Sequence, residues 1–121
     1  MSTPIAVVTG GAGFIGSHAV DALVARGYTV RVIDDLRGGR VANIEHVLGG
    51  SSVVLHEVDI CTLAPDSPIF EGADLVLHFA GIGDIVPSVE RPAEYMETNV
   101  MGTVRVLEAA RHAGVRRFVY A

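Results

Sequence analysis

Lysine is absent from this chain of 121 residues, and all nine of its basic side chains are arginines. The formal net charge is −5, which argues against a nucleic-acid-binding surface. A single cysteine, Cys61, excludes an internal disulfide and a cysteine-based metal site. No apolar stretch approaches 18 residues, and no basic segment precedes an apolar one at the N-terminus. We therefore expect no signal peptide, no membrane span and a cytoplasmic location.

Two kinds of catalytic site also lack their motifs. The five histidines, His18, His46, His56, His78 and His112, fall on different expected elements with no H-x-x-x-H pair, so no metal site is predicted. A G-x-S-x-G sequence is missing, which disfavours an α/β-hydrolase.

Half of the residues are hydrophobic and 19% are charged, as in a globular chain with one core.

The apolar run Ile5-Ala-Val-Val-Thr9 ends abruptly in glycines, and a helix-like pattern follows at once. Gly10, Gly11, Gly13 and Gly16 fit the G-x-G-x-x-G spacing of dinucleotide-binding proteins and its G-x-x-G-x-x-G variant. Gly10 or Gly11 would permit a tight turn, Gly13 would let the backbone approach a pyrophosphate, and Gly16 would let the helix pack closely on the strand. The helix N-terminus would add free N–H groups for the phosphates. A plain glycine-rich turn is the alternative.

Apolar runs and helical patterns alternate along the rest of the chain. Strands are expected around Val7 and Val8, over Tyr28–Ile33, Val53–Glu57 and Ala73–Phe79, and from Arg117 to Ala121. Helices are expected over Phe14–Arg26, Val41–Leu48 and from Pro92 to Gly114, with at most one helical turn in Ala64–Glu71 and loops over Leu36–Arg40 and Ala80–Arg91. This alternation predicts an α/β fold with a doubly wound parallel sheet and right-handed crossovers.

Periodicity also assigns faces to two of the helices. On the first helix, Ile15, Ala19, Ala22 and Leu23 share one face. The apolar stripe of the long helix is Met96, Val100, Val104, Leu107 and Ala110.

Asp34 ends the second strand, 18 residues after Gly16, close to the spacing of the acid that binds the adenine ribose of a dinucleotide. A carboxylate there accepts hydrogen bonds from two ribose hydroxyls and repels a 2′-phosphate, which favours NAD over NADP. Arg37 and Arg40 weaken that preference, because an arginine could pair with such a phosphate. For Asp34 the alternative is a loop residue that begins a turn, and the role of Asp35 is less clear.

Two further segments follow strands. Asp59-Ile60 comes after the third strand, where a carboxylate can meet the adenine amino group and an apolar side chain can cover the ring. Phe79-Ala-Gly-Ile-Gly83 comes after the fourth, where small residues let a second ribose and a nicotinamide lie close to the backbone. Taken singly, each segment is equally explained as an ordinary turn.

Together these segments resemble the extended short-chain dehydrogenase/reductases, and among them the NAD-dependent epimerase/dehydratase family of nucleotide sugars. The motifs that carry the resemblance are Thr9-Gly-Gly-Ala-Gly-Phe-Ile-Gly-Ser-His18, Asp34-Asp-Leu-Arg-Gly-Gly-Arg40, Asp59-Ile60, His78-Phe-Ala-Gly81, Ser88-Val-Glu-Arg-Pro92, Glu94-Tyr95, Asn99-Val-Met-Gly-Thr103, Leu107-Glu-Ala-Ala110 and Arg117-Phe-Val-Tyr-Ala121. Asp35 stands where the family usually has Asn. The resemblance runs almost end to end and implies an NAD(P)-binding Rossmann fold that is incomplete at its C-terminal end.

The resemblance also implies a cofactor site. The pyrophosphate would be held by Gly10, Gly13, Phe14 and Ile15. The adenine ribose would be bound by Asp34, and the adjoining part of the cofactor by Asp35, Leu36, Arg37 and Gly38. The adenine would contact Asp59 and Ile60, and the nicotinamide ribose would contact Phe79, Ala80 and Gly81. Asn99 would contact the cofactor or support the sheet, or would simply be a satisfied buried amide.

The greatest likeness is to the UDP-sugar 4-epimerases, in which bound NAD takes a hydride from C4 of the sugar and returns it to the other face. Their catalytic Tyr-x-x-x-Lys lies downstream of a strand like the last one here, and a chain without lysine cannot contain it. We therefore expect no catalytic residue and no metal in this chain, which would supply the cofactor-binding half. A 4,6-dehydratase, a decarboxylase or a non-catalytic NAD-binding module are the alternatives. The family commonly dimerises through helices that include the one after strand four.

The chain stops within an apolar strand, so we expect residues 1–121 to be the N-terminal part of a larger protein. A short domain closed by its last strand is the alternative. Expressed alone, residues 1–121 should expose Phe118, Val119 and Tyr120 at an unpaired sheet edge, and should aggregate or remain molten. A purified 121-residue protein that is monomeric and unfolds in one sharp transition without NAD would contradict this expectation.

Overall fold

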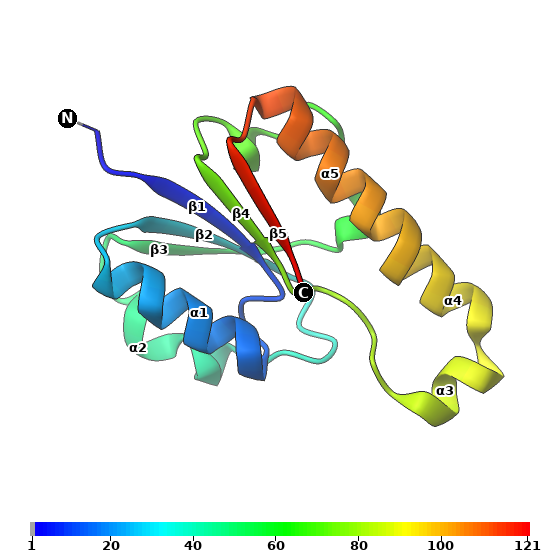
Figure 1. Ribbon diagram of the computed structural model, residues 1–121. Helices are drawn as coiled ribbons and strands as arrows, with labels where there is room; N and C mark the ends of the chain where they lie inside the picture. The colour runs from blue at the N-terminus through cyan, green and yellow to red at the C-terminus, as the bar shows by residue number, and fades with distance from the viewer. Residues whose placement is uncertain (1) are drawn as a thin grey trace.

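A computed structural model describes residues 2–121. Its five strands form one parallel sheet in the order β3-β2-β1-β4-β5 (Figure 1). The strands are β1 (Ile5–Thr9), β2 (Thr29–Asp34), β3 (Val53–Glu57), β4 (Leu75–His78) and β5 (Arg117–Tyr120). The doubly wound parallel sheet predicted from the sequence is confirmed.

Helical segments connect the strands. They are α1 (Phe14–Ala25), η1 (Val41–Asn43), α2 (Glu45–Leu48), η2 (Ile60–Thr62), η3 (Pro68–Phe70), α3 (Ile85–Glu90), α4 (Pro92–Met96), the π-helical segment η4 (Glu97–Met101) and α5 (Gly102–Ala113). The predicted long helix is thus α4, η4 and α5 in succession. Within residues 2–121, none of the helices has the length and apolarity needed to cross a membrane.

Side chains of β1 alternate between two hydrophobic cores. Ala6 and Val8 belong to the core under α1 and α2, whereas Val7 packs with Phe70 and Val106 in the core under α5. Figure 1 shows these helices on opposite faces of the sheet. Because each fully buried valine stabilises the fold by roughly 1.5–3 kcal/mol, β1 anchors both layers.

The position of β1 also creates a place for a ligand. From β1 the chain continues to β2 and β3 on one side, and it then returns to β4 on the other side. The connections that leave the carboxyl ends of β1 and β4 therefore run to opposite faces of the sheet. In open α/β sheets this reversal of strand order leaves a crevice in which ligands bind.

The predicted loop over Ala80–Arg91 is wrong in its second half, where Ile85–Glu90 form α3. Pro87 is the third residue of this helix. A first-turn residue has no intrahelical partner for its N–H, so proline costs little there.

The apolar stripes identified in the sequence coincide only in part with the buried faces of α1 and of the α4–α5 helix. Met96, Val100, Val104 and Leu107 are 41–60% exposed. The buried side of α5 carries the smaller residues, among them Gly102, Val106, Ala109 and Ala110. On α1, Ile15 and Ala22 are exposed, and the buried residues are Gly16, Ser17, Val20 and Leu23. A helix approaches its neighbours most closely through its smallest side chains, and both helices use that face.

A buried histidine joins the ends of β1 and β4. Nδ1 of His78 lies 2.6 Å from Oγ1 of Thr9, which also accepts hydrogen bonds from the N–H groups of Phe79 and Ala80. The Thr9 hydroxyl must therefore donate to Nδ1. Nε2 of His78 lies 2.8 Å from Oγ1 of Thr103. Because the Thr103 hydroxyl itself donates to a backbone carbonyl, Nε2–H is the donor to Thr103 and the imidazole is neutral.

This arrangement predicts a pH dependence of stability. Burial lowers the pKa of His78 from its ordinary 6.5 to about 4. The unfolded chain therefore binds a proton more readily, so the stability that His78 contributes is complete above pH 6.5 and is lost as the pH falls toward 4. We expect the free energy of unfolding to fall by about 1–2 kcal/mol between pH 7 and pH 5 through this residue, measured by urea denaturation.

His78→Asn should remove that part of the pH dependence. His112→Asn is the matched control, because His112 is exposed at the end of α5 and has no such pair of hydroxyl partners within residues 2–121. Equal slopes of unfolding free energy against pH in the wild type and His78→Asn would refute the assignment.

Candidate functional site

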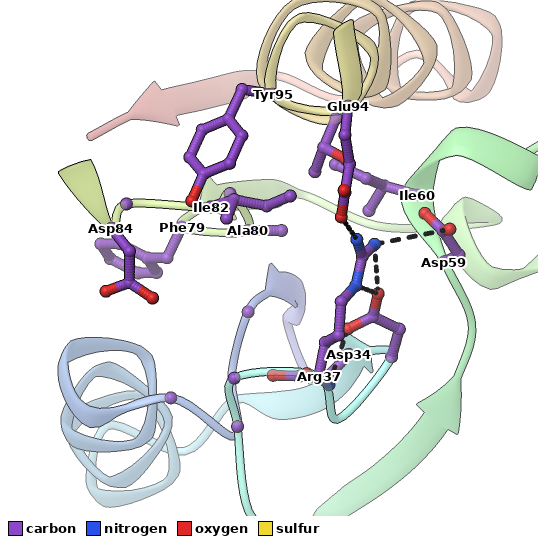
Figure 2. A pocket seen from close by; sticks show the side chains of 18 of the residues that line it. Asp34, Arg37, Asp59, Ile60, Phe79, Ala80, Ile82, Asp84, Glu94 and Tyr95 are labelled. Atoms are coloured by element: carbon purple, nitrogen blue, oxygen red, sulfur yellow. Dashed lines mark hydrogen bonds and ion pairs between the residues drawn. The ribbon is translucent and has the colours of Figure 1, made fainter. Parts of the chain in front are cut away.

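A groove of about 640 Å³ opens at the carboxyl ends of the strands (Figure 2). Its volume is within the range of small-molecule sites. The groove brings together most of the predicted site residues: Gly10, Gly13, Asp34, Asp35, Arg37, Gly38, Asp59, Ile60, Phe79, Ala80 and Gly81. It is not lined by Phe14, Ile15, Leu36 or Asn99, which were also predicted. The predicted residues that do line it come from four separate segments of the chain and converge on one cavity.

The glycine loop after β1 depends on two very close contacts. Gly10 has a φ of +70°, and a Cβ on it would lie 2.8 Å from the backbone nitrogen of Ala80. A Cβ on Gly16 would lie 2.1 Å from the carbonyl oxygen of Gly10. No side chain fits at either position. Gly16 was expected to bring the helix onto the strand, but the structure shows that it brings the helix onto its own preceding loop.

The first turn of α1 begins at the edge of the groove, which Gly13 lines. Gly13 is the N-cap, no side chain caps the helix, and no acidic residue lies in the first turn. The side chains of Phe14 and Ile15 are 78% and 66% exposed and do not line the cavity, so only main-chain groups of this turn are available to a ligand there. Unpaired N–H groups at the positive end of a helix favour a phosphate group.

The Asp34 carboxylate is buried at the end of β2 and ties two loops together. Oδ2 accepts a hydrogen bond of 3.0 Å from the N–H of Ala12, and Oδ1 accepts one of 2.8 Å from the N–H of Leu36. Leu36 has a φ of +63°, and its side chain packs against the core under α1. A carboxylate has about four acceptor positions, so two remain for a ligand.

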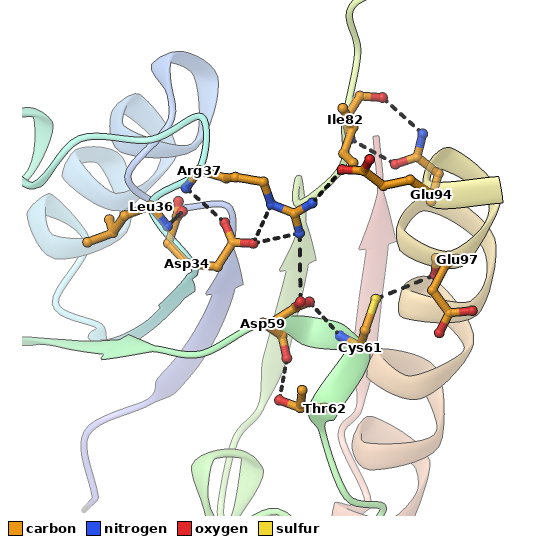
Figure 3. Close-up of polar contacts among 11 residues, drawn as sticks. Asp34, Leu36, Arg37, Asp59, Cys61, Thr62, Ile82, Glu94 and Glu97 are labelled. Atoms are coloured by element: carbon orange, nitrogen blue, oxygen red, sulfur yellow. Dashed lines mark hydrogen bonds and ion pairs between the residues drawn. The ribbon is translucent and has the colours of Figure 1, made fainter. Parts of the chain in front are cut away.

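Arg37 bridges three carboxylates across the groove (Figure 3). Its guanidinium lies 2.8 Å from Asp35, 3.2 Å from Glu94 on α4 and 3.7 Å from Asp59 beyond β3. The hydrogen bond to Asp35 raises the pKa of Arg37, with smaller contributions from the charges of Asp59 and Glu94. The charge of Arg37 is therefore already balanced within the protein.

Asp59 and Ile60 have structural contacts as well as a place in the groove. Oδ1 of Asp59 accepts the N–H of Cys61 at 2.9 Å and caps η2, as a turn residue would. Ile60 is only 4% exposed, and it packs so closely on α5 that a Cβ on Gly102 would lie 2.6 Å from its Cδ1. Both residues are thus held rigidly at one end of the cavity.

Asn99 supports the loop after β4. Its Oδ1 accepts the N–H of Ile82 at 2.8 Å, and its Nδ2 donates to the Ile82 carbonyl at 2.9 Å. Its half-buried amide is therefore paired with the backbone of this loop. The neighbouring Thr98 lines the groove. The π-helical turn η4, which contains both residues, is of a kind that occurs often at functional sites.

Several groove residues were not identified from the sequence: Ile33, Gly39, Val58, Asp84, Pro87, Arg91, Glu94, Tyr95 and Thr98. Four of them share a detectable pattern. Arg91, Glu94, Tyr95 and Thr98 stand at positions i, i+3, i+4 and i+7, which is one face of a helix. Polar side chains at that spacing beside an apolar stripe indicate a helix face turned to a ligand. Within residues 2–121, no group of three His, Cys, Asp or Glu side chains is arranged to hold a metal ion.

Comparison with known proteins places this groove in a family. The sequence pattern of the NAD dependent epimerase/dehydratase family matches residues 6–121. The UDP-glucose 4-epimerase uge1 of Schizosaccharomyces pombe is 35% identical over 95% of this chain and 34% of its own length. For the UDP-glucose 4-epimerase of Bos taurus the identity is 38%, over 95% of this chain and 36% of that protein. The chain thus spans about a third of the length of these relatives.

Solved structures agree. The UDP-glucose-4-epimerase of Stenotrophomonas maltophila, with bound NAD and formylated UDP-arabinopyranose, superposes with a TM-score of 0.86 at 32% identity, over 98% of this chain and 36% of that one. DesIV, a dTDP-glucose 4,6-dehydratase from Streptomyces venezuelae with NAD and TYD bound, also has a TM-score of 0.86, at 36% identity over 94% of this chain and 38% of its own. With its glycine loop, its parallel sheet and its groove, the chain belongs to the NAD-dependent epimerase/dehydratase family.

Proposed function

We propose that this chain supplies the cofactor-binding part of an NAD-dependent nucleotide-sugar 4-epimerase that acts on a UDP-sugar. One observation carries the proposal: a single groove unites an uncapped helix N-terminus, a buried carboxylate after β2, and the loops after β3 and β4. The relatives named as UDP-glucose 4-epimerases support the choice of reaction.

Along the groove, successive groups of residues would each bind a successive part of NAD. The free N–H groups of Phe14 and Ile15, with the backbone of Gly10 and Gly13, would hold the pyrophosphate. Asp34 would use its two remaining acceptor positions for the adenine ribose hydroxyls. Asp35, Arg37 and Gly38 with Asp59 and Ile60 would enclose the adenine end, and Phe79 to Gly81 the nicotinamide ribose. Bound NAD would supply hydride acceptance and return, whereas the chain itself would bind and orient it. No general base is assigned to the chain.

Activity of the full-length gene product tests this proposal. Incubation with UDP-glucose or UDP-galactose, followed by chromatographic separation of the sugar nucleotides, should show the two interconverting. The similarity to DesIV supports a 4,6-dehydratase as the second candidate. Such an enzyme would instead give a 4-keto-6-deoxy sugar from its nucleotide-glucose substrate. NAD binding with no turnover of any nucleotide sugar would favour the non-catalytic module. A cytoplasmic location, which agrees with the single cysteine, remains part of the proposal.

We expect NAD to bind more tightly than NADP. Asp34 would repel a 2′-phosphate, and Arg37 already shares its charge with three carboxylates, so it is a poor partner for that phosphate. Asp34→Ala should weaken NAD binding by about 30- to 100-fold in calorimetric titration, because two charge-assisted hydrogen bonds are lost.

The thermal stability of empty Asp34→Ala must be recorded beside that titration, because the variant also loses the contacts to Ala12 and Leu36. Arg40→Ala is the control, since Arg40 is exposed and has no ion pair within residues 2–121. Tighter binding of NADP than NAD by the wild type would overturn the preference.

We further propose a homodimer that pairs through α4 and α5. Four large apolar side chains of this helix, Met96, Val100, Val104 and Leu107, are exposed along one stripe. Leu107→Glu should shift the full-length protein from dimer to monomer in sedimentation velocity at micromolar concentration, because a charge would have to be buried in the apolar contact. Val54→Glu, an equally exposed apolar site on β3, should leave the dimer intact. A wild-type monomer would contradict the proposal.

A further inference from the structure

The hydroxyl of Tyr95 has no hydrogen-bond partner although it is buried. Tyr95 is 9% exposed, and its Oη is the one buried side-chain nitrogen or oxygen within residues 2–121 that lacks a partner. The large majority of buried polar side-chain atoms in proteins are paired, and an unpaired one costs stability. Residues 2–121 therefore supply no hydrogen-bond partner for this hydroxyl, and a bound molecule could supply one.

The hydroxyl points into the groove. Tyr95 lines the cavity from α4, and Figure 2 shows its ring extending toward the loop after β4, with the hydroxyl beside Ile82 and on the side of Asp84. Glu94, the preceding residue, extends instead to Arg37 at the adenine end. The short helix α4 therefore contacts both halves of the cavity through neighbouring side chains.

The chemical character of the hydroxyl limits what it can bind. Burial raises the pKa of Tyr95; the charges of Asp84 and Glu94 act in the same direction, and that of Arg91 opposes them. The group therefore keeps its proton at neutral pH and can donate it. The adjacent loop carries Gly81 and Gly83, both exposed, so an acceptor can reach the hydroxyl after a small backbone adjustment.

We propose that the Tyr95 hydroxyl donates a hydrogen bond to an acceptor on the nicotinamide half of NAD, either a ribose or a phosphate oxygen. This inference rests on the proposed function, because it takes NAD as the occupant of the groove. It adds Tyr95 to Phe79, Ala80 and Gly81 as a further residue that recognises the half of the cofactor away from Asp34. The hydrogen bond forms only in the complex, so it favours the bound state without stabilising the empty protein.

Tyr95→Phe in the full-length protein tests the inference, because it removes the hydroxyl and keeps the ring. Calorimetric titration with NAD should show binding weakened by about 3- to 10-fold, the usual contribution of one hydrogen bond. Titration with AMP, which carries only the adenine half, should be unchanged. The melting temperature of the empty variant should equal or exceed that of the wild type, because an unpaired buried hydroxyl has been removed.

Tyr28→Phe is the matched control, since Tyr28 is partly buried against the other core and does not line the groove. It should change neither titration. Equal NAD affinity in the wild type and Tyr95→Phe would overturn the inference, as would an equal loss of AMP affinity, a lower melting temperature of the empty variant, or an effect confined to UDP-sugar binding. Failure of the wild type to bind NAD at all would refute the proposed function itself.

Discussion

The contact between Gly16 and the carbonyl of Gly10 is the constraint on which the site depends. A methyl group at Gly16 would lie 2.1 Å from that oxygen, so only glycine lets α1 pack directly on the loop that follows β1. The helix N-terminus is thereby held near the carboxyl end of β1, beside the groove that Gly10 and Gly13 line. Gly10 in turn touches the backbone of Ala80, which fixes the loop after β1 against the loop after β4. Both walls of the cavity are therefore positioned by main-chain contacts.

Charge in the groove is arranged around Arg37. Asp35, Asp59 and Glu94 come from three different elements, and without a cation between them they would repel one another and an incoming phosphate. Arg37 lies within 4 Å of all three and joins the ends of β2 and β3 to α4. Each of these ion pairs is partly exposed and weak alone, so their joint effect on the potential of the site outweighs their effect on stability. Asp34 remains outside this cluster, bound to backbone N–H groups.

The sequence predicted the sheet well because buried parallel strands are short apolar runs, and it predicted most of the groove because those residues directly follow strands. The sequence did not predict which face of a helix is buried, because side-chain packing determines it. The periodicity of Met96, Val100, Val104 and Leu107 shows that they share a face, but it does not show which face meets the core. The smaller residues around Gly102 and Ala109 pack there instead. Tyr95 and Thr98 were missed because they belong to a helix face, whereas the predicted Asn99 pairs with Ile82 beside the groove.

The glycines of this chain differ in whether a second substitution elsewhere could make room for a side chain at the glycine position. At Gly10 and Gly16 the obstructing atoms are main chain, so no replacement elsewhere creates room for a side chain. At Gly102 the obstruction is the tip of the Ile60 side chain. A shorter residue at position 60 would admit a methyl group at position 102 and restore the contact between η2 and α5. A substitution at position 102 can therefore be compensated at position 60, whereas a substitution at Gly10 or Gly16 cannot be compensated by a side-chain change elsewhere.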